Sequence, residues 1–358
     1  MMPTESAQSI RLARSLEHRQ TFACFGSECT VIVADAARQA DAAAAVAMTK
    51  RALLEWHHRF SRFEPTSEVS ILNRTPGETV GVSPLMRRVL DAALQGARDT
   101  GGLVDATLGA EIERAGYASD FVQDGIPLSL ALSQAPPRAP AGVHPAGSWR
   151  KILIDRRAGT VKRPSGMQLD LGGIAKGVFA DELSALLAGF DAFALDCAGD
   201  IRLGGRARTE REVHVASPFD DSRLHTFALA AGAVATSGIG KRSWLTPEGR
   251  PAHHLLDPRT GRPAFTGVVQ ATALAGTAAN AEVLAKAAIL SGPERAARWL
   301  ARGGVLVFDD GSYEVVEASS CAQGTTTASS CGESRATTYS AASESDTFSS
   351  TCVSRGGT

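Results

Sequence analysis

The sequence lacks the features that mark secreted, membrane-embedded or nucleic-acid-binding proteins. Its 37 Lys and Arg residues are balanced by 38 Asp and Glu, so the formal net charge is −1 and there is no overall basic bias. Residues 1–20 contain arginines but no apolar stretch typical of a signal peptide. The nearest approach to a long apolar run, residues 42–48, is alanine-rich and too short to cross a bilayer. We therefore expect a cytoplasmic protein with no membrane span and no nucleic-acid partner.

The six cysteines also lack a metal-binding pattern. No C-x-x-C occurs, Cys24 and Cys29 lie five apart in a strand-like segment, and three cysteines lie beyond residue 320. This spacing argues against both zinc and a disulfide framework. In a reducing compartment, Cys24 and Cys29 are most simply small buried hydrophobic residues.

What the sequence does contain is typical of a globular protein. It has 358 residues, of which 44% are hydrophobic and 21% charged, enough for one large or two medium domains. We expect a flexible N-terminal arm over 1–20 and a folded unit over 21–317. Residues 318–358 are dominated by Ser, Thr, Ala and Gly, which predicts a disordered tail. A short adhesive or modified tail is the alternative.

Periodicity indicates both helices and strands. Helical spacing predicts helices over 36–56, 84–100, from the glycine motif described below to about 188, and 278–290. Ser83 is expected to cap the second helix, with Pro84 at its first position. Strand-like runs cover 21–33, interrupted at Gly26, then 192–195, 212–217, 225–236, 267–275 and 304–308, with a hairpin over 151–162 and a loop over 118–148.

Residues 168–181 (QLDLGGIAKGVFAD) form the segment around which the rest is organised. Gly172 and Gly173 allow the backbone to approach a ligand closely, and the helix that follows offers free N–H groups to an anion. Asp170 and Lys176 frame this turn. The alternative is an ordinary strand-to-helix connection with a surface lysine.

Several segments together fit one family pattern. They are FSRF at 60–63 with SEVSILN at 67–73, VDATLG at 104–109, LDLGGIAKG at 169–177, AGDI at 198–201, ATSG at 235–238 and HLLDPRTG at 254–261. In this order and spacing they resemble the ApbE family of FAD:protein FMN transferases, from about residue 22 to about residue 308. The resemblance implies an α+β fold of two lobes (T-fold-like) with FAD between them. It also implies cleavage of the FAD pyrophosphate, transfer of FMN to a Thr or Ser of an acceptor protein, release of AMP and assistance by Mg2+.

The resemblance assigns roles to individual residues. The catalytic pair would be His254 and Asp257, with His254 as general base toward the acceptor hydroxyl. FAD would be contacted by Phe25, Phe63, Leu103, Val104, Asp105, Asp170, Lys176 and Leu255. The metal residues would be Gly173, through its carbonyl, with Glu282 and Lys286.

These roles agree with the chemistry of phosphoryl-linked transfer, which needs neutralised pyrophosphate charge and an aligned hydroxyl. A histidine with a pKa near its ordinary value of about 6.5 suits acceptance of the hydroxyl proton. Structural alternatives stay open at several positions. Phe25 and Phe63 are alternatively core residues, His254 a strand residue bonded to a carbonyl, and Asp257 a turn starter.

The sequence departs from the family pattern in the helix over 278–290. Glu282 and Lys286 stand where the family typically has Asp and, four residues later, Thr. The i, i+4 spacing keeps one helix face, but a protonated lysine cannot bind a metal ion. One hypothesis is a surface Glu–Lys pair. The other is that the Lys286 ammonium replaces part of the charge that Mg2+ would supply to the pyrophosphate. Ala198, in place of a glycine, and the missing aromatic residue after Gly238 are smaller departures.

We accordingly predict a flavin transferase acting on a separate acceptor protein that presents a Thr or Ser in a glycine-containing loop. Two alternatives remain: an FAD pyrophosphatase that releases FMN and AMP, and a protein that binds FAD without turnover.

Overall fold

A nine-stranded sheet is the centre of the computed structural model, which describes residues 17–117, 126–319 and 336–339. Its neighbours all pair antiparallel, in the order β1-β2-β6-β7-β10-β15-β16-β17-β18. The strands are β1 (Glu17–Cys24), β2 (Ser27–Ala34), β6 (Ala192–Cys197), β7 (Asp200–Gly204), β10 (Gly232–Gly238), β15 (Val268–Ala275), β16 (Gly304–Phe308), β17 (Tyr313–Val316) and β18 (Ala336–Tyr339).

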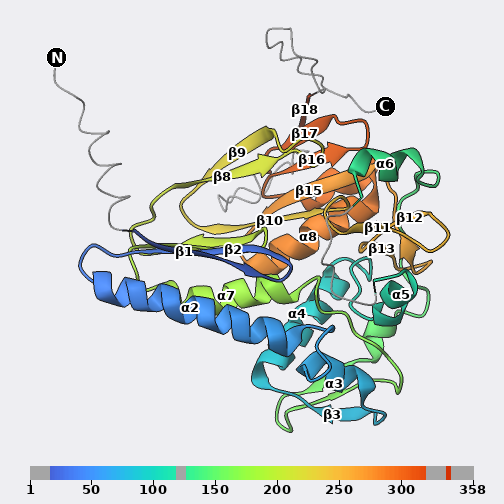
Figure 1. Cartoon of the computed structure of the whole chain (residues 1–358), viewed down its shortest axis with the longest axis horizontal. Coiled ribbons are helices and arrows are strands. Elements are labelled where there is room, and N and C mark those ends of the chain that lie inside the picture. The colour runs from blue at the N-terminus through green and yellow to red at the C-terminus, as the bar shows by residue number, and fades with distance from the viewer. Residues whose placement is uncertain (1–16, 118–125, 320–335, 340–358) are drawn as a thin grey trace, which may run out of the picture.

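Helices cover one face of this sheet, with α2 on β1 and β2, α7 on β6 and β7, and α8 on β10 and β15 (Figure 1). The described helices are α2 (Gln39–Phe60), α3 (Glu68–Arg74), α4 (Pro84–Asp99), α5 (Gly109–Arg114), α6 (Leu128–Ser133), α7 (Ala175–Leu187), α8 (Ala278–Ser291) and α9 (Pro293–Ala296), with short 3-10 turns at Ser148–Lys151 and Ala297–Trp299. The mixture of helix and sheet confirms the α+β prediction, while the division into two lobes stays a prediction.

Smaller sheets surround the main one. They are β3 (Thr79–Gly81) with β5 (Thr160–Lys162) and β4 (Leu153–Asp155), β8 (Arg211–Ala216) with β9 (Arg223–Leu229), β11 (Ser243–Leu245) with β12 (Pro251–His253), and β13 (Leu256–Asp257) with β14 (Arg262–Pro263). The β4–β5 pair confirms the hairpin predicted over 151–162.

Alternating side chains show how the main sheet buries both of its faces. Along β10, Ala233 and Ala235 belong to the core shared with the helices, whereas Val234 packs with Leu203 and with Val213 of the β8–β9 hairpin. Successive side chains of a strand point to opposite faces, so β10 contributes to two apolar layers at once. The β8–β9 hairpin therefore covers the face opposite the helices.

Local capping explains where several helices begin. The Ser83 hydroxyl accepts the Met86 N–H and Pro84 opens α4, as predicted. Ser67 caps α3 in the same way by accepting the Ser70 N–H. The helix predicted over 36–56 runs three to four residues later, at Gln39–Phe60.

The run at 21–33 is a hairpin rather than one interrupted strand. Phe25 and Gly26 have φ angles of 57° and 67° and form a two-residue turn between β1 and β2. Gly26 interrupts the strand-like pattern of the sequence, but here it supplies the left-handed conformation that the turn requires. The correction matters because this turn brings the Phe25 ring to the site described below.

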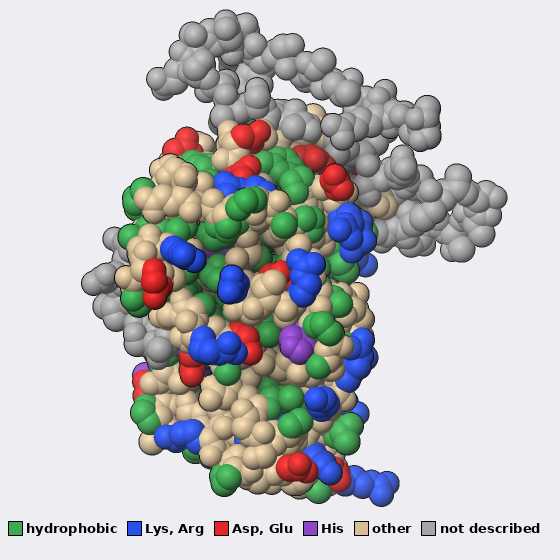
Figure 2. All heavy atoms as spheres, turned by 90° about the vertical axis from the view of Figure 1, so that its right-hand side faces the viewer, with side chains coloured by type: hydrophobic (Ala, Val, Ile, Leu, Met, Phe, Trp, Pro, Cys, Tyr) green, Lys and Arg blue, Asp and Glu red, His purple; other side chains and the backbone are tan. Residues whose placement is uncertain are grey.

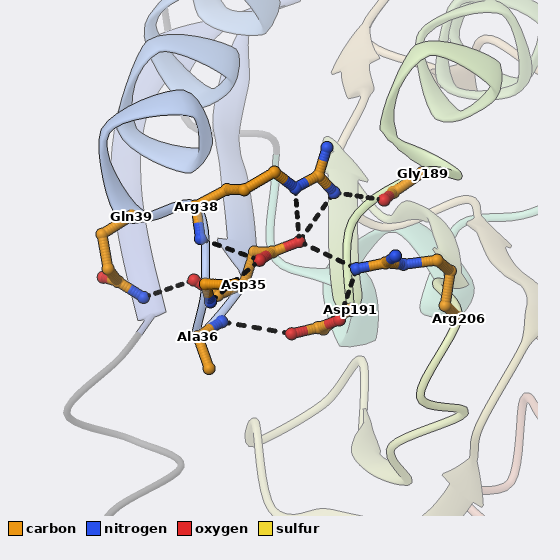
Figure 3. Close-up of polar contacts among 8 residues, drawn as sticks. Asp35, Ala36, Arg38, Gln39, Gly189, Asp191 and Arg206 are labelled. Atoms are coloured by element: carbon orange, nitrogen blue, oxygen red, sulfur yellow. Dashed lines mark hydrogen bonds and ion pairs between the residues drawn. The ribbon is translucent and has the colours of Figure 1, made fainter.

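A polar cluster links the start of α2 to the residue that follows β2 and the residue that precedes β6 (Figure 3). The Asp35 carboxylate accepts the N–H groups of Ala37 and Arg38 at 3.1 and 3.0 Å and pairs with the Arg38 guanidinium at 2.7 Å. Arg206 joins Asp35 at 3.2 Å to Asp191 at 2.8 Å. The cluster thus links segments distant in the sequence without a contribution to the cavity described below.

The expected terminal segments are only partly described. Residues 17–20 of the predicted flexible arm belong to β1, and residues 336–339 of the predicted disordered tail form β18 along β17, so those parts of both predictions are wrong. Residues 1–16, 320–335 and 340–358, and 118–125 of the predicted loop, lie outside the described residues, while α6 forms within that loop. Of the described helices, none combines the length and apolar character needed to span a bilayer.

Candidate active site

A cavity of about 1100 Å³ gathers the segments singled out in the sequence. Its described lining includes the β1–β2 turn, the end of α2 with the residues that follow it, and residues 103–108. It also includes the glycine motif, α8, the β8–β9 hairpin and the segment that follows β12. Every sequence-predicted site residue except Asp257 lines this cavity. Figure 2 shows the side of the molecule that carries α5, α6 and β11 to β13, where Lys and Arg side chains spread over the middle of the face with hydrophobic side chains between them.

Backbone contacts hold the glycine motif in place. Asn73 on α3 bonds both backbone groups of Leu169, at 2.8 and 2.9 Å, and the Asp170 N–H reaches the Ala106 carbonyl at 2.9 Å. The Asp170 carboxylate accepts the Gly172 N–H at 2.8 Å and pairs with Arg62 at 3.4 Å. The motif is therefore a folded loop, with Asp170 at its first turn, that leads into α7.

Gly177 lets α7 lie against α8 at very short range. A Cβ at this position would be 2.6 Å from the Ala279 Cα, closer than real Cβ contacts occur. The Gly177 N–H also donates to Oε2 of Glu282 at 3.1 Å. This close approach brings the first turn of α7, with Lys176, beside the Glu282 and Lys286 face of α8.

Two lysines and two carboxylates meet there, all with side chains at most 14% exposed. Lys176 Nζ lies 2.5 Å from Oδ2 of Asp200 and 3.6 Å from Oε1 of Glu282, and Lys286 Nζ lies 2.9 Å from the same Glu282 oxygen. The low exposure shows that the pair on α8 belongs to the cavity wall, so the surface-pair hypothesis is wrong.

Electrostatics inside this quartet favour a charged Lys176 and an ionised Glu282. Burial by itself would lower the pKa of Lys176, but Asp200 and Glu282 outweigh it and raise that pKa. Burial would likewise raise the pKa of Glu282, but Lys286 and Lys176 outweigh it and lower that pKa. Burial, and then repulsion from Glu282, raises the pKa of Asp200 to about 7. The wall therefore presents two ammonium groups to the cavity.

Apolar and aromatic side chains form other parts of the lining. The Phe25 ring lies against Phe179, and Phe63 packs edge-on against Tyr117 with 5.3 Å between ring centres. Tyr117 stacks in turn on Trp244 at 5.3 Å and 17°. The rings of Phe25, Phe63 and Tyr117 lie in the lining with Leu103, Val104 and Leu255, and such a surface suits the planar rings of a nucleotide or flavin.

His254 projects into the same cavity in a neutral state. Burial, followed by Arg242, His253 and Lys286, lowers the pKa of His254 well below its ordinary value, which corrects the value near 6.5 assumed from the sequence. Its Nδ1 is buried, and no described residue bonds it. A neutral ring with a bare nitrogen is able to accept a proton.

Asp105 offers a second unfilled acceptor. Its Oδ1 accepts the Thr107 N–H and hydroxyl at 2.8 and 2.7 Å, whereas its buried Oδ2 has no bond within the described part of the chain. Burial raises the pKa of this carboxyl group. Buried polar atoms are rarely left unpaired, so this oxygen points to a donor from a ligand.

Comparisons with known proteins agree with this geometry. The model of the ApbE family matches residues 25–308. The chain belongs to the ApbE family. Relatives named FAD:protein FMN transferase include one from Treponema pallidum, 29% identical over 79% of this chain and 81% of its own, and one from Vibrio cholerae, 28% identical over 68% and 72%.

Solved structures of this family share the fold. The Thermotoga maritima ApbE protein aligns with a TM-score of 0.68 at 24% identity, covering 86% of this chain and 98% of its own. The apo form of the Pseudomonas stutzeri flavinyl transferase ApbE aligns with a TM-score of 0.64 at 20% identity, covering 82% and 92%.

The magnesium site implied by the ApbE resemblance does not fit the side chains found here. One oxygen of Glu282 is shared by two ammonium groups, and the other accepts the Gly177 N–H. Lys286 supplies donors only, whereas Mg2+ requires oxygen ligands in octahedral geometry at about 2.0–2.1 Å. A divalent ion in this place would meet two ammonium groups that already pair with the Glu282 carboxylate.

Asp257 has a different place in this ApbE fold. Its carboxylate accepts the N–H groups of Gly142 and Arg259 at 2.9 and 3.0 Å, and its carbonyl accepts the N–H of Gly261 at 2.8 Å. These contacts favour the turn-starter interpretation over a catalytic role.

Sequence reasoning missed several lining residues. Arg62, Tyr117 and Arg242 line the cavity, and no role was assigned to them from the sequence, although Arg62 lies inside the FSRF segment. Trp244, which stacks on Tyr117 outside the lining, was also not predicted. Arg242 bonds the Phe25 carbonyl at 2.8 Å and so fixes the β1–β2 turn. Asp200 lies in the AGDI segment, but no role was assigned to it from the sequence.

Proposed function

We propose that this chain transfers FMN from FAD to a Thr or Ser hydroxyl of a separate acceptor protein and releases AMP. Membership of the ApbE family and relatives that carry the name of this activity support the proposal. The observation that carries it is the convergence of Lys176, Glu282 and His254, from three distant segments, on one cavity. The cytoplasmic location expected from the sequence stays a prediction.

The bound FAD would lie in the cavity with its diphosphate against the ammonium groups of Lys176 and Lys286. The rings of Phe25 and Phe63 would flank its aromatic ends, and Leu103, Val104 and Leu255 would complete the apolar contacts. The unpaired Oδ2 of Asp105 would accept a hydrogen bond from a ribityl, ribose or ring donor. Asp170, which orders the glycine loop, would orient the backbone N–H groups near the diphosphate.

The reaction balances with these groups. The acceptor oxygen attacks the phosphorus of the FMN half, forming a new P–O bond while the P–O bond to the AMP phosphate breaks. AMP leaves with the electron pair, and its developing negative charge faces the lysines. The hydroxyl proton passes to His254, whose ring is neutral and whose Nδ1 has no partner among the described residues.

Covalent flavin on an acceptor is the direct test. The protein is incubated with FAD and a flavin-free acceptor domain; we expect acid-stable flavin fluorescence on the acceptor band of a denaturing gel and AMP in equal amount by chromatography. His254→Asn should reduce transfer by about 10²–10⁴-fold without loss of FAD binding. His58→Asn, which changes an exposed histidine outside the lining, is the matched control.

Other outcomes select other functions. FMN and AMP released without acceptor would favour a pyrophosphatase in which water replaces the hydroxyl. FAD retained with no AMP formed would favour a binding protein and contradict the transfer.

A further inference from the structure

Of the three residues expected to hold a metal ion, Gly173 and Glu282 flank the side chain of the third, Lys286. A Cβ on Gly173 would lie 3.1 Å from Cε and 3.8 Å from Nζ of Lys286. The same ammonium lies 2.9 Å from Oε1 of Glu282. The Lys286 ammonium thus occupies the space between the backbone of Gly173 and the carboxylate of Glu282.

The hydrogen bonds of this ammonium leave donors for a ligand. A lysine ammonium has three N–H donors. Among the described residues, Lys286 donates one of them, to Glu282, while its side chain stays 10% exposed at the cavity wall. Glu282 is itself held by the Gly177 N–H, so it fixes the position of the Lys286 ammonium. It accepts only one of the three N–H donors of that ammonium.

The surroundings add positive charge on the same wall. Lys176 reaches Glu282 at 3.6 Å, and both Lys241 and Arg242 line the cavity. Lys176 pairs mainly with Asp200, at 2.5 Å. Glu282 lies closer to Lys286, at 2.9 Å, than to Lys176, at 3.6 Å. A diphosphate placed between the glycine loop and α8 would meet fixed cationic donors without any added ion.

We propose that the Lys286 ammonium, positioned by Glu282, binds the FAD diphosphate in place of a divalent cation, so that this chain holds FAD and transfers FMN without magnesium. The inference rests on the proposed function, because it assumes that the dinucleotide occupies this cavity. In this proposal Lys286 binds the diphosphate, and Glu282, on the same face of α8, positions its ammonium group.

The test measures FAD affinity by flavin fluorescence, with excess EDTA and with added Mg2+, on the full-length chain. We expect the wild-type Kd to agree within about threefold under the two conditions. Lys286→Met should weaken FAD binding about tenfold to a hundredfold in both, the loss expected for a hydrogen bond to a charged group. Riboflavin, which lacks the diphosphate, should bind the variant and the wild type equally.

Further variants separate charge from folding. Lys286→Arg should recover part of the affinity in EDTA, and Lys162→Met, at an exposed lysine outside the lining, should change nothing. If Lys286→Met does not fold, Glu282→Gln combined with Lys286→Met removes both charges, and weakened FAD binding is again expected. Glu282→Asp combined with Lys286→Thr restores oxygen ligands and should make FAD binding depend on Mg2+.

Two results would overturn the inference. Wild-type FAD binding that requires Mg2+, and that Lys286→Met leaves unaltered, contradicts it while leaving the transferase proposal intact. No FAD binding under either condition contradicts both.

Discussion

Replacement of Gly177 by alanine tests whether the contact between α7 and α8 builds the site. The added Cβ would meet the Ala279 Cα at 2.6 Å and N at 2.7 Å, and these are backbone atoms that cannot rotate away. Inserting a methyl group into a packed interior costs up to about 3 kcal/mol. Alanine in place of glycine inside a helix returns about 1 kcal/mol. We therefore expect Gly177→Ala to lower the free energy of unfolding by about 2 kcal/mol.

The same substitution should impair FAD binding. Separation of the helices stretches the 3.1 Å bond from the Gly177 N–H to Glu282 and moves Lys176 away from the Lys286 face. We expect FAD affinity to fall about tenfold or more, the scale of one lost hydrogen bond to a charged group.

Urea denaturation followed by circular dichroism measures the stability, and flavin fluorescence measures the affinity. Gly189→Ala is the matched control, because Gly189 follows the same helix and a Cβ there meets no atom within 4 Å. The control should be neutral or slightly stabilising. Equal stability and equal FAD affinity of Gly177→Ala and Gly189→Ala would refute the packing argument.

Three further predictions concern the core, the pH dependence and a strained turn. Phe179 is fully buried among aromatic rings, so Phe179→Ala should lower the free energy of unfolding by about 3–5 kcal/mol. A decrease below about 1 kcal/mol in urea melts would contradict its central place in the core. Burial lowers the pKa of His253 to about 3, so its contribution to stability is complete above about pH 6.5 and is lost as pH falls toward 3. Urea melts across this range should therefore show a shallower acid slope for His253→Gln than for the wild type, by up to about 1.4 kcal/mol per pH unit, and identical slopes would disprove the assignment. Ala198 has a φ of 58°, so Ala198→Gly should raise the free energy of unfolding by about 0.5–1 kcal/mol after the entropic cost of glycine; a decrease would show that the turn is not strained.

The elements that sequence reasoning located correctly are those determined by local chemistry. Ser83 and Pro84 specify the start of α4 through one hydroxyl bond and one fixed φ angle. The sequence of α8 is rich in alanine and leucine, which favour helix by themselves. The Phe25–Gly26 turn was misread because phenylalanine rarely adopts a positive φ. That conformation coexists with a tertiary bond, from Arg242 to the Phe25 carbonyl, which no local pattern reveals.

Elements that depend on pairing between distant segments escaped prediction for a related reason. β18 contains no long apolar run, yet its backbone extends the sheet beside β17, because strand pairing uses N–H and C=O groups that every residue type except proline carries. Tyr117 and Trp244 stack across the fold, although neither lies in a periodic segment that indicates contact. The family motifs located most of the cavity wall, but they indicated neither Tyr117 in that wall nor Trp244 stacked on it.

Burial decides the meaning of the Glu282–Lys286 pair, which the sequence left open. An i, i+4 Glu–Lys pair on an exposed helix face contributes only about 0.2–0.5 kcal/mol. Here the side chains are 1% and 10% exposed, so both charges have lost most of their hydration. A buried pair gives at best a small net stabilisation, because desolvation offsets the attraction, and an apolar pair of similar size packs as well or better. Stability therefore does not explain two buried charges at this position, whereas the diphosphate binding that we propose for this cavity would explain them.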